Sequence, residues 1–298
     1  MRVYEIYSPV QNLALPLLSQ KNIHVDVKRD DMIHPYISGN KWRKLKYIIR
    51  KAESESRDHI VTFGGAWSNH ILATACLSAD LGLKSTAYIR GERVENPVLQ
   101  LCELFGMELR FTDRERYKNK KLLFDVYHKN DSKVFFVDEG GFSIEGAKGC
   151  EEILEDLPFQ YDHIFCACGT GATLAGLAKG AETYQPKAIV HGVPVLKGGD
   201  FIAGAVESLY PDLTNIKLHT DYHFGGYAKT KEPLIEFIRK FCSSTGLLIE
   251  PVYTGKVFYA LMDLIEKDYF EPGEKILIIH TGGLTGFLGN YKLFTKKH

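Results

Sequence analysis

The chain has 298 residues, and its 37 Lys and Arg side chains balance 37 Asp and Glu side chains, so the formal net charge is zero. A chain of this length can bury a sizeable core in one large or two modest domains. The charge balance gives no support to nucleic acid or a membrane surface as the main partner, and a small molecule is the expected ligand.

The N-terminal residues and the cysteines predict a cytoplasmic protein. Residues 1–20 lack the apolar core of a signal peptide, and no stretch reaches about 18 uninterrupted apolar residues. The six cysteines form no Cys-x-x-Cys pair, so we expect reduced core residues, without a disulfide framework or a metal site.

The most informative segment is Ser38-Gly39-Asn40-Lys41, which leads into a helical pattern. Its apolar positions are Trp42, Leu45, Ile48, Ile49 and Ala52. This spacing predicts a helix fixed against a core, with Lys41 at its start. A lysine held in a partly dry place beside other cations has a lowered pKa and can form Schiff bases with carbonyl compounds. The alternative is a solvated basic helix start.

From about residue 58 onward, short apolar runs alternate with helical patterns. The runs are typical of strands buried on both faces of a parallel sheet. They are His59–Phe63, Ser85–Ile89, Val134–Val137, His163–Cys166, Ala188–Val190 and Lys275–Ile279. Asn96 and Pro97 predict the start of a helix that closes at Gly106.

The alternation predicts an α/β protein with open, mostly parallel twisted sheets covered by helices. We expect two domains, a smaller one of residues 53–145 and a larger one of residues 1–52 and 146–298. Ligands of such sheets bind beyond the carboxyl ends of the strands. Three glycine-rich segments are expected there, at residues 64–70, 169–173 and 281–283.

In the first glycine-rich segment, Ser68 and Asn69 follow two glycines and are typical caps of a helix. The same helix start would suit a substrate carboxylate, with the Ser68 hydroxyl and nearby N–H groups as donors. Capping alone also explains these residues.

The second segment, Gly169-Thr170-Gly171-Ala172-Thr173, follows a predicted strand and opens a helix. Glycines let successive N–H groups turn toward one point, and the threonine hydroxyls add donors, so we predict a phosphate site. Leu174 stands in place of the third glycine of the dinucleotide pattern, which favours a monophosphate ligand. A purely structural turn is the alternative.

Two tyrosines and a threonine complete the candidate set. Tyr227 follows two glycines and Tyr253 lies between a proline and a glycine, whereas most of the 16 tyrosines are expected in the core or on the surface. Thr281 ends a predicted strand in a tight turn, where its hydroxyl could reach a ring nitrogen.

In order and spacing, these motifs resemble the pyridoxal-phosphate-dependent family of 1-aminocyclopropane-1-carboxylate (ACC) deaminase and D-cysteine desulfhydrase. The resemblance runs nearly end to end and rests on Ser38-Gly-Asn-Lys41, Ser68-Asn-His70, Gly169-Thr-Gly171, Pro251-Val-Tyr-Thr-Gly-Lys256 and His280-Thr-Gly-Gly283. It implies the tryptophan-synthase-β-like fold (fold type II), pyridoxal 5′-phosphate between two domains, and a homodimer.

The resemblance also implies residue roles. Lys41 would bind the cofactor covalently and later move the substrate's α-proton. Asn69 would bond the cofactor's ring hydroxyl, and Ser68, Asn69 and His70 would hold the substrate carboxylate. Tyr227 and Tyr253 would flank the substrate as acid, base or stacking partner, and Thr254 and Thr281 would contact the cofactor. The residues near the cofactor phosphate would be Lys44, Gly169, Thr170, Gly171, Ala172 and Thr173.

Two positions separate the activities of this family. The deaminases have glutamate after the second tyrosine and leucine after the histidine of the strand-end turn, whereas this sequence has Thr254 and Thr281, as the desulfhydrases do. A threonine near the pyridine nitrogen cannot protonate it as a carboxylate partner would. The resemblance therefore favours β-elimination from D-cysteine, giving a 2-oxo acid, ammonia and sulfide. Trp67 replaces a glutamine of the relatives and predicts a narrower or more hydrophobic mouth.

Several alternatives remain open at this point. ACC deaminase, which gives 2-oxobutanoate and ammonia, is the alternative activity, followed by D-serine dehydration or racemisation. More distant alternatives are a non-catalytic protein that binds phosphate or a nucleotide at the Gly169 loop, and a regulatory pyridoxal-phosphate protein.

Overall fold

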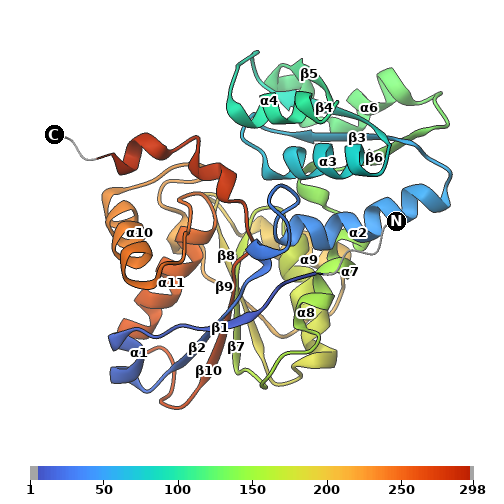
Figure 1. The fold of residues 1–298 in the computed structure, drawn as a ribbon. Helices are drawn as coiled ribbons and strands as arrows, with labels where there is room; N and C mark the ends of the chain where they lie inside the picture. The colour runs from blue at the N-terminus through green and yellow to red at the C-terminus, as the bar shows by residue number, and fades with distance from the viewer. Residues whose placement is uncertain (1–5, 296–298) are drawn as a thin grey trace.

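The computed structural model describes residues 6–295 and contains two sheets, each covered by helices (Figure 1). The larger sheet has the order β1-β2-β10-β7-β8-β9, and the smaller has the order β5-β4-β3-β6. The larger sheet consists of β1 (Val10–Asn12), β2 (His24–Lys28), β7 (His163–Cys168), β8 (Ile189–Pro194), β9 (Ile216–Leu218) and β10 (Lys275–Ile279). The smaller consists of β3 (His59–Gly64), β4 (Lys84–Arg90), β5 (Glu108–Thr112) and β6 (Val134–Val137). Within residues 6–295, all paired strands are parallel except β1 and β2.

The larger sheet is buried on both faces, as the apolar strand runs require. Along β7, Phe165 and Ala167 pack with the helices of one face, while Ile164, Cys166 and Cys168 pack with those of the other. The α-helices of the described chain are α1 (Pro16–Lys21), α2 (Asn40–Ser54), α3 (Asn69–Asp80), α4 (Pro97–Leu104), α5 (Arg114–Lys118), α6 (Lys120–His128), α7 (Ile144–Glu151), α8 (Ala172–Tyr184), α9 (Phe201–Leu209), α10 (Glu232–Thr245) and α11 (Thr254–Glu266).

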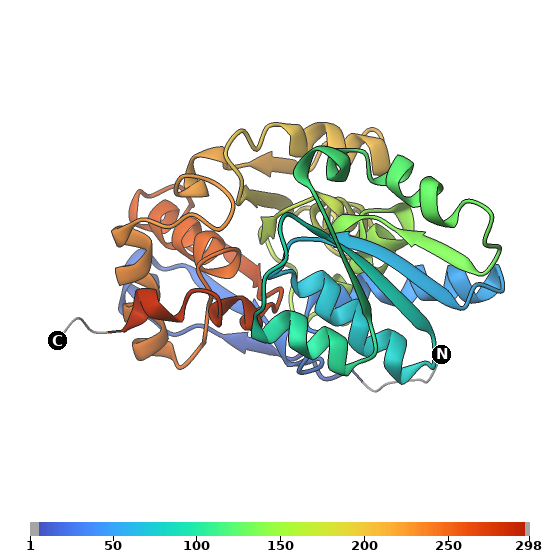
Figure 2. The ribbon, with the colours of Figure 1, turned by 90° about the horizontal axis from the view of Figure 1, so that it is seen from above.

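Helix α2 lies between the two sheets (Figure 1). Its apolar face, with Leu45 and Ile49, packs against Ile60 of β3 and Ala73 of α3. On its other side α7 comes so close that a Cβ on Gly149 would overlap the carbonyl oxygen of Arg43. This packing fixes the start of α2 between the two sheets. Seen from above, the smaller sheet covers one end of the molecule and leaves α10 and α11 at the other (Figure 2).

The α/β prediction is confirmed, and the six predicted strands form at the predicted places. Two of them, β6 and β10, have the predicted bounds, whereas β8 begins one residue later than predicted and runs on to Pro194. Asn96 caps α4 through a bond from the Leu99 amide, as predicted.

The sequence reading missed β1, β2, β5 and β9, each for a physical reason. Strands β1, β5 and β9 are edge strands with partly exposed residues. Strand β2 is buried but contains Asp26, whose carboxylate accepts a bond of 2.8 Å from the Tyr161 hydroxyl. A charged residue interrupts the apolar pattern of a buried strand. The partner that allows Asp26 to be buried, Tyr161, is distant in the sequence and could not be foreseen.

The division into domains of residues 53–145 and 1–52 with 146–298 stays a proposal. The strands of the smaller sheet all fall within residues 59–137, and those of the larger sheet fall outside them. Helix α2 ends at the proposed boundary, although its apolar face packs on the smaller sheet.

All six cysteines carry free thiols, and five of them are buried. Residues 6–295 hold no cluster of three or more His, Cys, Asp or Glu side chains that could bind a metal ion. Among these same residues, no helix is both long and apolar enough to cross a membrane.

Candidate active site

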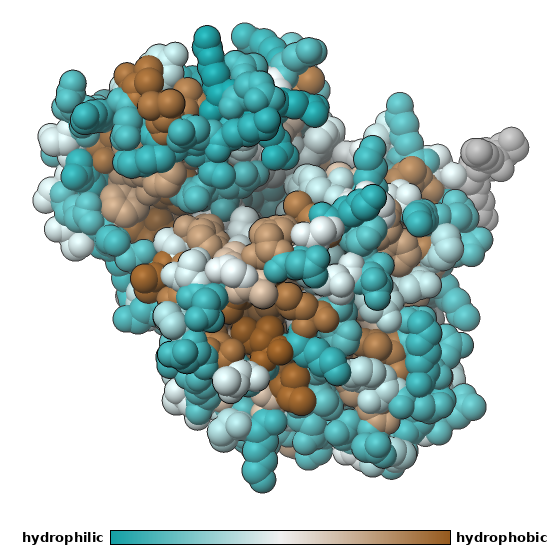
Figure 3. Space-filling model, turned by 180° about the vertical axis from the view of Figure 1, so that it is seen from behind, coloured by the Kyte–Doolittle hydropathy of each residue, from teal (hydrophilic) through white to brown (hydrophobic). Residues whose placement is uncertain are grey.

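A cavity of about 490 Å³ lies between the two sheets. In the view from behind, the surface is hollowed below the part of the chain that contains the smaller sheet (Figure 3). The predicted site residues that line the cavity are Lys41, Lys44, Ser68, Asn69, His70, Gly169, Thr170, Gly171, Thr173, Tyr227, Tyr253 and Thr281. Ala172 and Thr254 do not line it.

Lys41 is placed by the turn before α2. Gly39 caps this helix with φ +62°, and a Cβ there would overlap the carbonyl oxygen of Thr281, so only glycine fits. The Lys41 amine donates to Asn40 Oδ1 at 2.9 Å, and Asn40 Nδ2 donates to Thr173 Oγ1 at 2.9 Å. The start of α2 is thus tied to the turn after β10 and to the start of α8.

Burial, together with the positive charge of nearby Lys44, lowers the pKa of Lys41 to about 7. Lys44 is also buried, which lowers its own pKa, and its amine donates to the Gly140 carbonyl at 3.1 Å. Near neutral pH a large share of Lys41 is therefore uncharged, which is the form in which an amine acts as a nucleophile or a base.

The Gly169 loop closes the cavity on the side of the larger sheet. Gly171 caps α8 with φ +95°, so the first amides of this helix have no carbonyl partners of their own helix. Ala172 and Thr173 are the first helical residues and are buried. A helix start beside two buried lysines is a place where an anion is stabilised.

The start of α3 faces the cavity from the smaller sheet. Ser68 Oγ accepts the Ile71 amide at 3.3 Å, which confirms the predicted cap. The Thr62 hydroxyl donates to the Val137 carbonyl at 3.0 Å, so it must accept from Nε2 of His70 at 2.8 Å. This leaves His70 Nδ1 without a proton and, within the described chain, without a partner.

Burial, with the charges of Lys41 and Lys44, holds the pKa of His70 well below its usual value. Its side chain is therefore a neutral acceptor. A carboxylate would gain no donor from this ring, so a role of His70 in holding the substrate carboxylate stays a prediction that would depend on its backbone amide. The hydroxyl of Ser68 and the amides that open α3 remain as donors for a carboxylate.

Tyr227 and Tyr253 lie against each other, with ring centroids 6.0 Å apart and ring planes at 73°. Burial raises the pKa of both, and the bond between their hydroxyls lowers the pKa of Tyr227 while it raises that of Tyr253. Tyr227 is therefore the easier of the two to deprotonate.

Two charged residues that the sequence analysis did not assign hold these tyrosines. The buried carboxylate of Glu250 accepts the amides of Val252, Tyr253 and Thr254 at 2.6–2.9 Å. The buried amine of Lys256 fixes the loop before Tyr227. Lys256 ends the motif Pro251–Lys256 and Glu250 directly precedes it, and the burial of both was not evident from the sequence.

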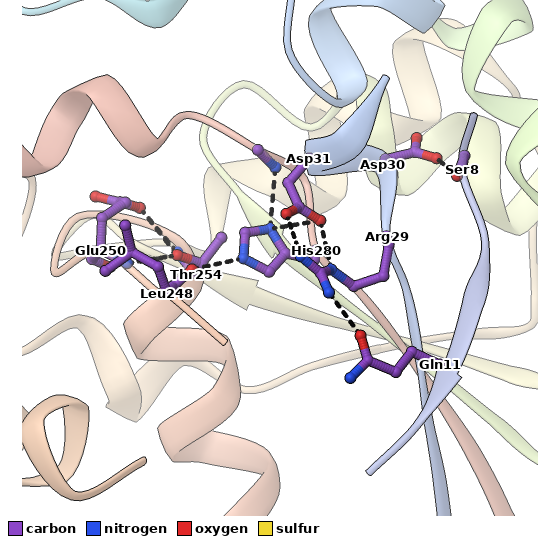
Figure 4. A network of polar contacts seen from close by, with 10 residues as sticks. Ser8, Gln11, Arg29, Asp30, Asp31, Leu248, Glu250, Thr254 and His280 are labelled. Atoms are coloured by element: carbon purple, nitrogen blue, oxygen red, sulfur yellow. Dashed lines mark hydrogen bonds and ion pairs between the residues drawn. The ribbon is translucent and has the colours of Figure 1, made fainter. Parts of the chain in front are cut away.

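The turn after β10 carries Thr281 into the cavity and His280 away from it. His280 Nε2 donates to the Leu248 carbonyl at 2.8 Å, and its Nδ1 lies 3.6 Å from Asp31 Oδ1 (Figure 4). Thr254 is fully buried, and its hydroxyl accepts the Glu250 amide at 2.8 Å. The predicted contact of Thr254 with a cofactor is therefore not supported, because its hydroxyl is used inside its own turn.

The cavity also contains residues that the sequence analysis missed. They come from the turn and start of α2, from the ends of β4 and β6, and from the start of α6, and they include Ser38, Asn40, Arg90, Lys120, Asp138 and Glu139. Ser38 and Asn40 stand inside the motif Ser38–Lys41 but were given no role of their own. The four charged residues carry no local sequence signal, because only the tertiary structure brings them to the cavity.

The family model described as pyridoxal-phosphate dependent enzyme matches residues 5–282. The chain belongs to this family. It is 33% identical to the bifunctional D-cysteine desulfhydrase/1-aminocyclopropane-1-carboxylate deaminase, mitochondrial, of Arabidopsis thaliana, over 94% of this chain and 77% of that protein. It is 30% identical to the D-cysteine desulfhydrase of Salmonella choleraesuis, over 95% and 94% of the two chains. A solved structure of an ACC deaminase homologue has a TM-score of 0.83 with 31% identity, over 96% and 93% of the chains.

The predicted family, the cofactor and fold type II are thereby confirmed. The residues of this chain fit the cofactor of the pyridoxal-phosphate enzymes. Lys41 supplies a buried amine with a lowered pKa, as a Schiff-base lysine needs. Lys44 and the start of α8 supply the charge and the amides that a phosphate needs. The distant alternative of a non-catalytic phosphate-binding protein is not supported by this family.

Proposed function

We propose that this enzyme catalyses β-elimination from a small D-amino acid, D-cysteine first, and releases a 2-oxo acid, ammonia and sulfide. The observation that carries the proposal is the lowered pKa of Lys41, about 7, at the floor of a cavity that also holds a helix start for a carboxylate. The printed names of the Arabidopsis and Salmonella relatives support the same activity.

When bound, pyridoxal phosphate supplies an electron-withdrawing ring that stabilises negative charge at the substrate's Cα. The residues of the chain do the rest. The start of α3, with Ser68, binds and orients the substrate carboxylate. Lys41, uncharged in a large share of molecules near neutral pH, takes the α-proton. Tyr227, the more acidic of the tyrosine pair, holds a proton for the departing group.

Only one of the two threonines that favour elimination over ring opening lies at the cavity. Of the two threonines that distinguish the desulfhydrases, Thr281 lines the cavity and Thr254 does not. The preference for elimination therefore rests on Thr281. ACC deamination to 2-oxobutanoate and ammonia stays the second candidate, because the Arabidopsis relative is named for both activities.

The test is 2-oxo acid release by the pyridoxal-phosphate-loaded protein, offered D-cysteine and ACC in parallel, with Lys41→Ala as the control. Pyruvate from D-cysteine that disappears in the control supports the proposal. Release of 2-oxobutanoate from ACC without pyruvate from D-cysteine would replace it by the second candidate. Reduction with borohydride followed by peptide mapping gives an independent readout, because it labels Lys41 only if this amine binds the cofactor.

We also propose that the chain forms a homodimer in the cytoplasm. Large apolar side chains are exposed on α4 and α6, among them Leu104, Leu122 and Val126. Light scattering of the purified protein would give the mass of one chain if the homodimer is wrong, and cell fractionation would test the compartment.

A further inference from the structure

Arg90 ends strand β4 and lines the same cavity as Lys41 and Lys44. Its guanidinium carbon lies 5.4 Å from the centre of the buried Tyr117 ring, a distance at which the ring face attracts a cation. Its Nη2 lies 3.8 Å from the place that a Cβ on Gly65 would occupy. Because residue 65 is a glycine that also lines the cavity, no side chain stands between the guanidinium and this part of the wall.

The other cations of the cavity all have acceptors. The amines of Lys41 and Lys44 donate to Asn40 Oδ1 and to the Gly140 carbonyl. Lys120 pairs with the carboxylates of Asp138 at 3.3 Å and Glu139 at 3.7 Å.

Arg90 differs, because its partly solvent-exposed guanidinium lies over the Tyr117 ring and, among the described residues, makes neither an ion pair nor a hydrogen bond. A guanidinium has five N–H donors in a flat fork, and it binds an oxyanion through two of them. A guanidinium at a cavity wall without a protein acceptor is therefore suited to an anion on a ligand.

The two anions already assigned to the ligands have donors elsewhere. In the proposed function, the cofactor phosphate is held by Lys44 and the start of α8, and the substrate α-carboxylate by the start of α3. Arg90 belongs to a different strand end from Ser68. Tyr227 lines the same cavity, where burial raises the pKa of this tyrosine and the positive charge of Arg90 acts against that rise.

We propose that Arg90 is a specificity-determining residue that binds an oxyanion on the β-substituent of the amino-acid substrate. The inference rests on the proposed function, because it takes the α-carboxylate site from it. The substrate class then includes amino acids whose β-substituent carries a carboxylate, a sulfate or a phosphate.

The experiment compares two ligands of similar size that differ in charge, aspartate and asparagine, each as both enantiomers. Binding to the pyridoxal-phosphate-loaded enzyme is followed by the change in cofactor absorbance, which needs no turnover. We expect aspartate of the accepted enantiomer to bind more tightly than asparagine. Arg90→Gln should weaken aspartate binding about 10- to 100-fold and bring the affinity ratio of the two ligands near one.

Arg93→Gln is the matched control, because Arg93 is exposed like Arg90 and follows β4 by three residues but does not line the cavity. It should leave the affinity ratio unchanged, and Arg90→Lys should give an intermediate ratio. An unchanged ratio in Arg90→Gln overturns the proposal, and so does an equal loss for both ligands, which would assign Arg90 to the α-carboxylate. A failure of the proposed function is seen separately, as the absence of pyruvate from D-cysteine.

Discussion

The amine of Lys256 lies 2.8 Å from the carbonyl oxygen of Gly226, the residue before Tyr227. The same amine donates to the carbonyls of Val195 at 3.1 Å and His223 at 2.9 Å, so all three of its protons are used. Lys256 is fully buried in α11. Its hydrogen bonds connect this helix to the residue after β8 and to the loop that carries Tyr227.

Replacing Lys256 by methionine should loosen the loop that carries Tyr227. Three carbonyls would lose their donor, and each unpaired buried group costs about 1–3 kcal/mol, so we expect a destabilisation of about 3 kcal/mol after local relaxation. Urea unfolding measures it, and kcat should fall more than KM rises, because Tyr227 is displaced. Lys267→Met is the control, since Lys267 is an exposed residue at the end of the same helix. Equal stability of the two variants would contradict the role of Lys256.

Replacing Gly39 by alanine should abolish cofactor binding. The new Cβ would overlap the Thr281 carbonyl oxygen, so the start of α2 and the turn after β10 must move apart. Gly82→Ala is the control for backbone strain alone, because Gly82 has φ +69° and open space around it. We expect about 1 kcal/mol of destabilisation for Gly82→Ala and clearly more for Gly39→Ala. The measurements are unfolding free energy and absorbance of the bound cofactor. Full absorbance in Gly39→Ala would show that the contact with Thr281 is not needed.

His70 should stay neutral, with its proton on Nε2, from pH 5 to pH 8. The Thr62 hydroxyl fixes this tautomer, and burial keeps the pKa of the ring well below its usual value. Nitrogen NMR of the labelled imidazole tests both statements. In Thr62→Val the acceptor for Nε2 is lost, and we expect a changed nitrogen spectrum and a destabilisation of about 1–3 kcal/mol. Titration of His70 between pH 5 and pH 7 in the wild-type protein would be incompatible with this arrangement.

Stability should fall as the pH drops below about 6.5 because of a chain of histidines across β7, β8 and β9. His163 Nδ1 lies 2.9 Å from His191 Nε2, and His191 Nδ1 lies 2.8 Å from His219 Nε2. Burial lowers the pKa of His191 to about 2 and that of His219 to about 4, from 6.5. Below pH 6.5 the unfolded chain therefore binds protons that the folded chain does not, and the folded state loses stability.

The contribution of His219 to this loss of stability is measured by urea unfolding of the wild type and a His219 variant at pH 7.5 and at pH 5. Its amide replacement His219→Gln can still donate to His191 but does not titrate, so this variant should lose about 1–2 kcal/mol less than the wild type between the two pH values. Parallel losses in both proteins would exclude a contribution from His219.

The sequence by itself determined the elements that local pattern dictates. The apolar runs predicted the central strands because buried parallel strands are apolar on both faces. Asn96 and Ser68 predicted helix starts because a cap bonds an amide only three residues away. The order of the short motifs was enough to identify the family and the cofactor, and it singled out Lys41 as the proposed Schiff-base lysine.

Only the tertiary structure decided how the site works, since the deciding partners are distant in the chain. The pKa of Lys41 depends on burial between two sheets, and the tautomer of His70 depends on the Val137 carbonyl. Thr254 does not line the cavity, and its hydroxyl accepts a hydrogen bond from the Glu250 amide. Arg90 was recognised as a cavity residue only in the structure, because parallel strands bring their carboxyl ends to one edge of the sheet. The lack of a protein acceptor for its guanidinium is likewise a property of the fold.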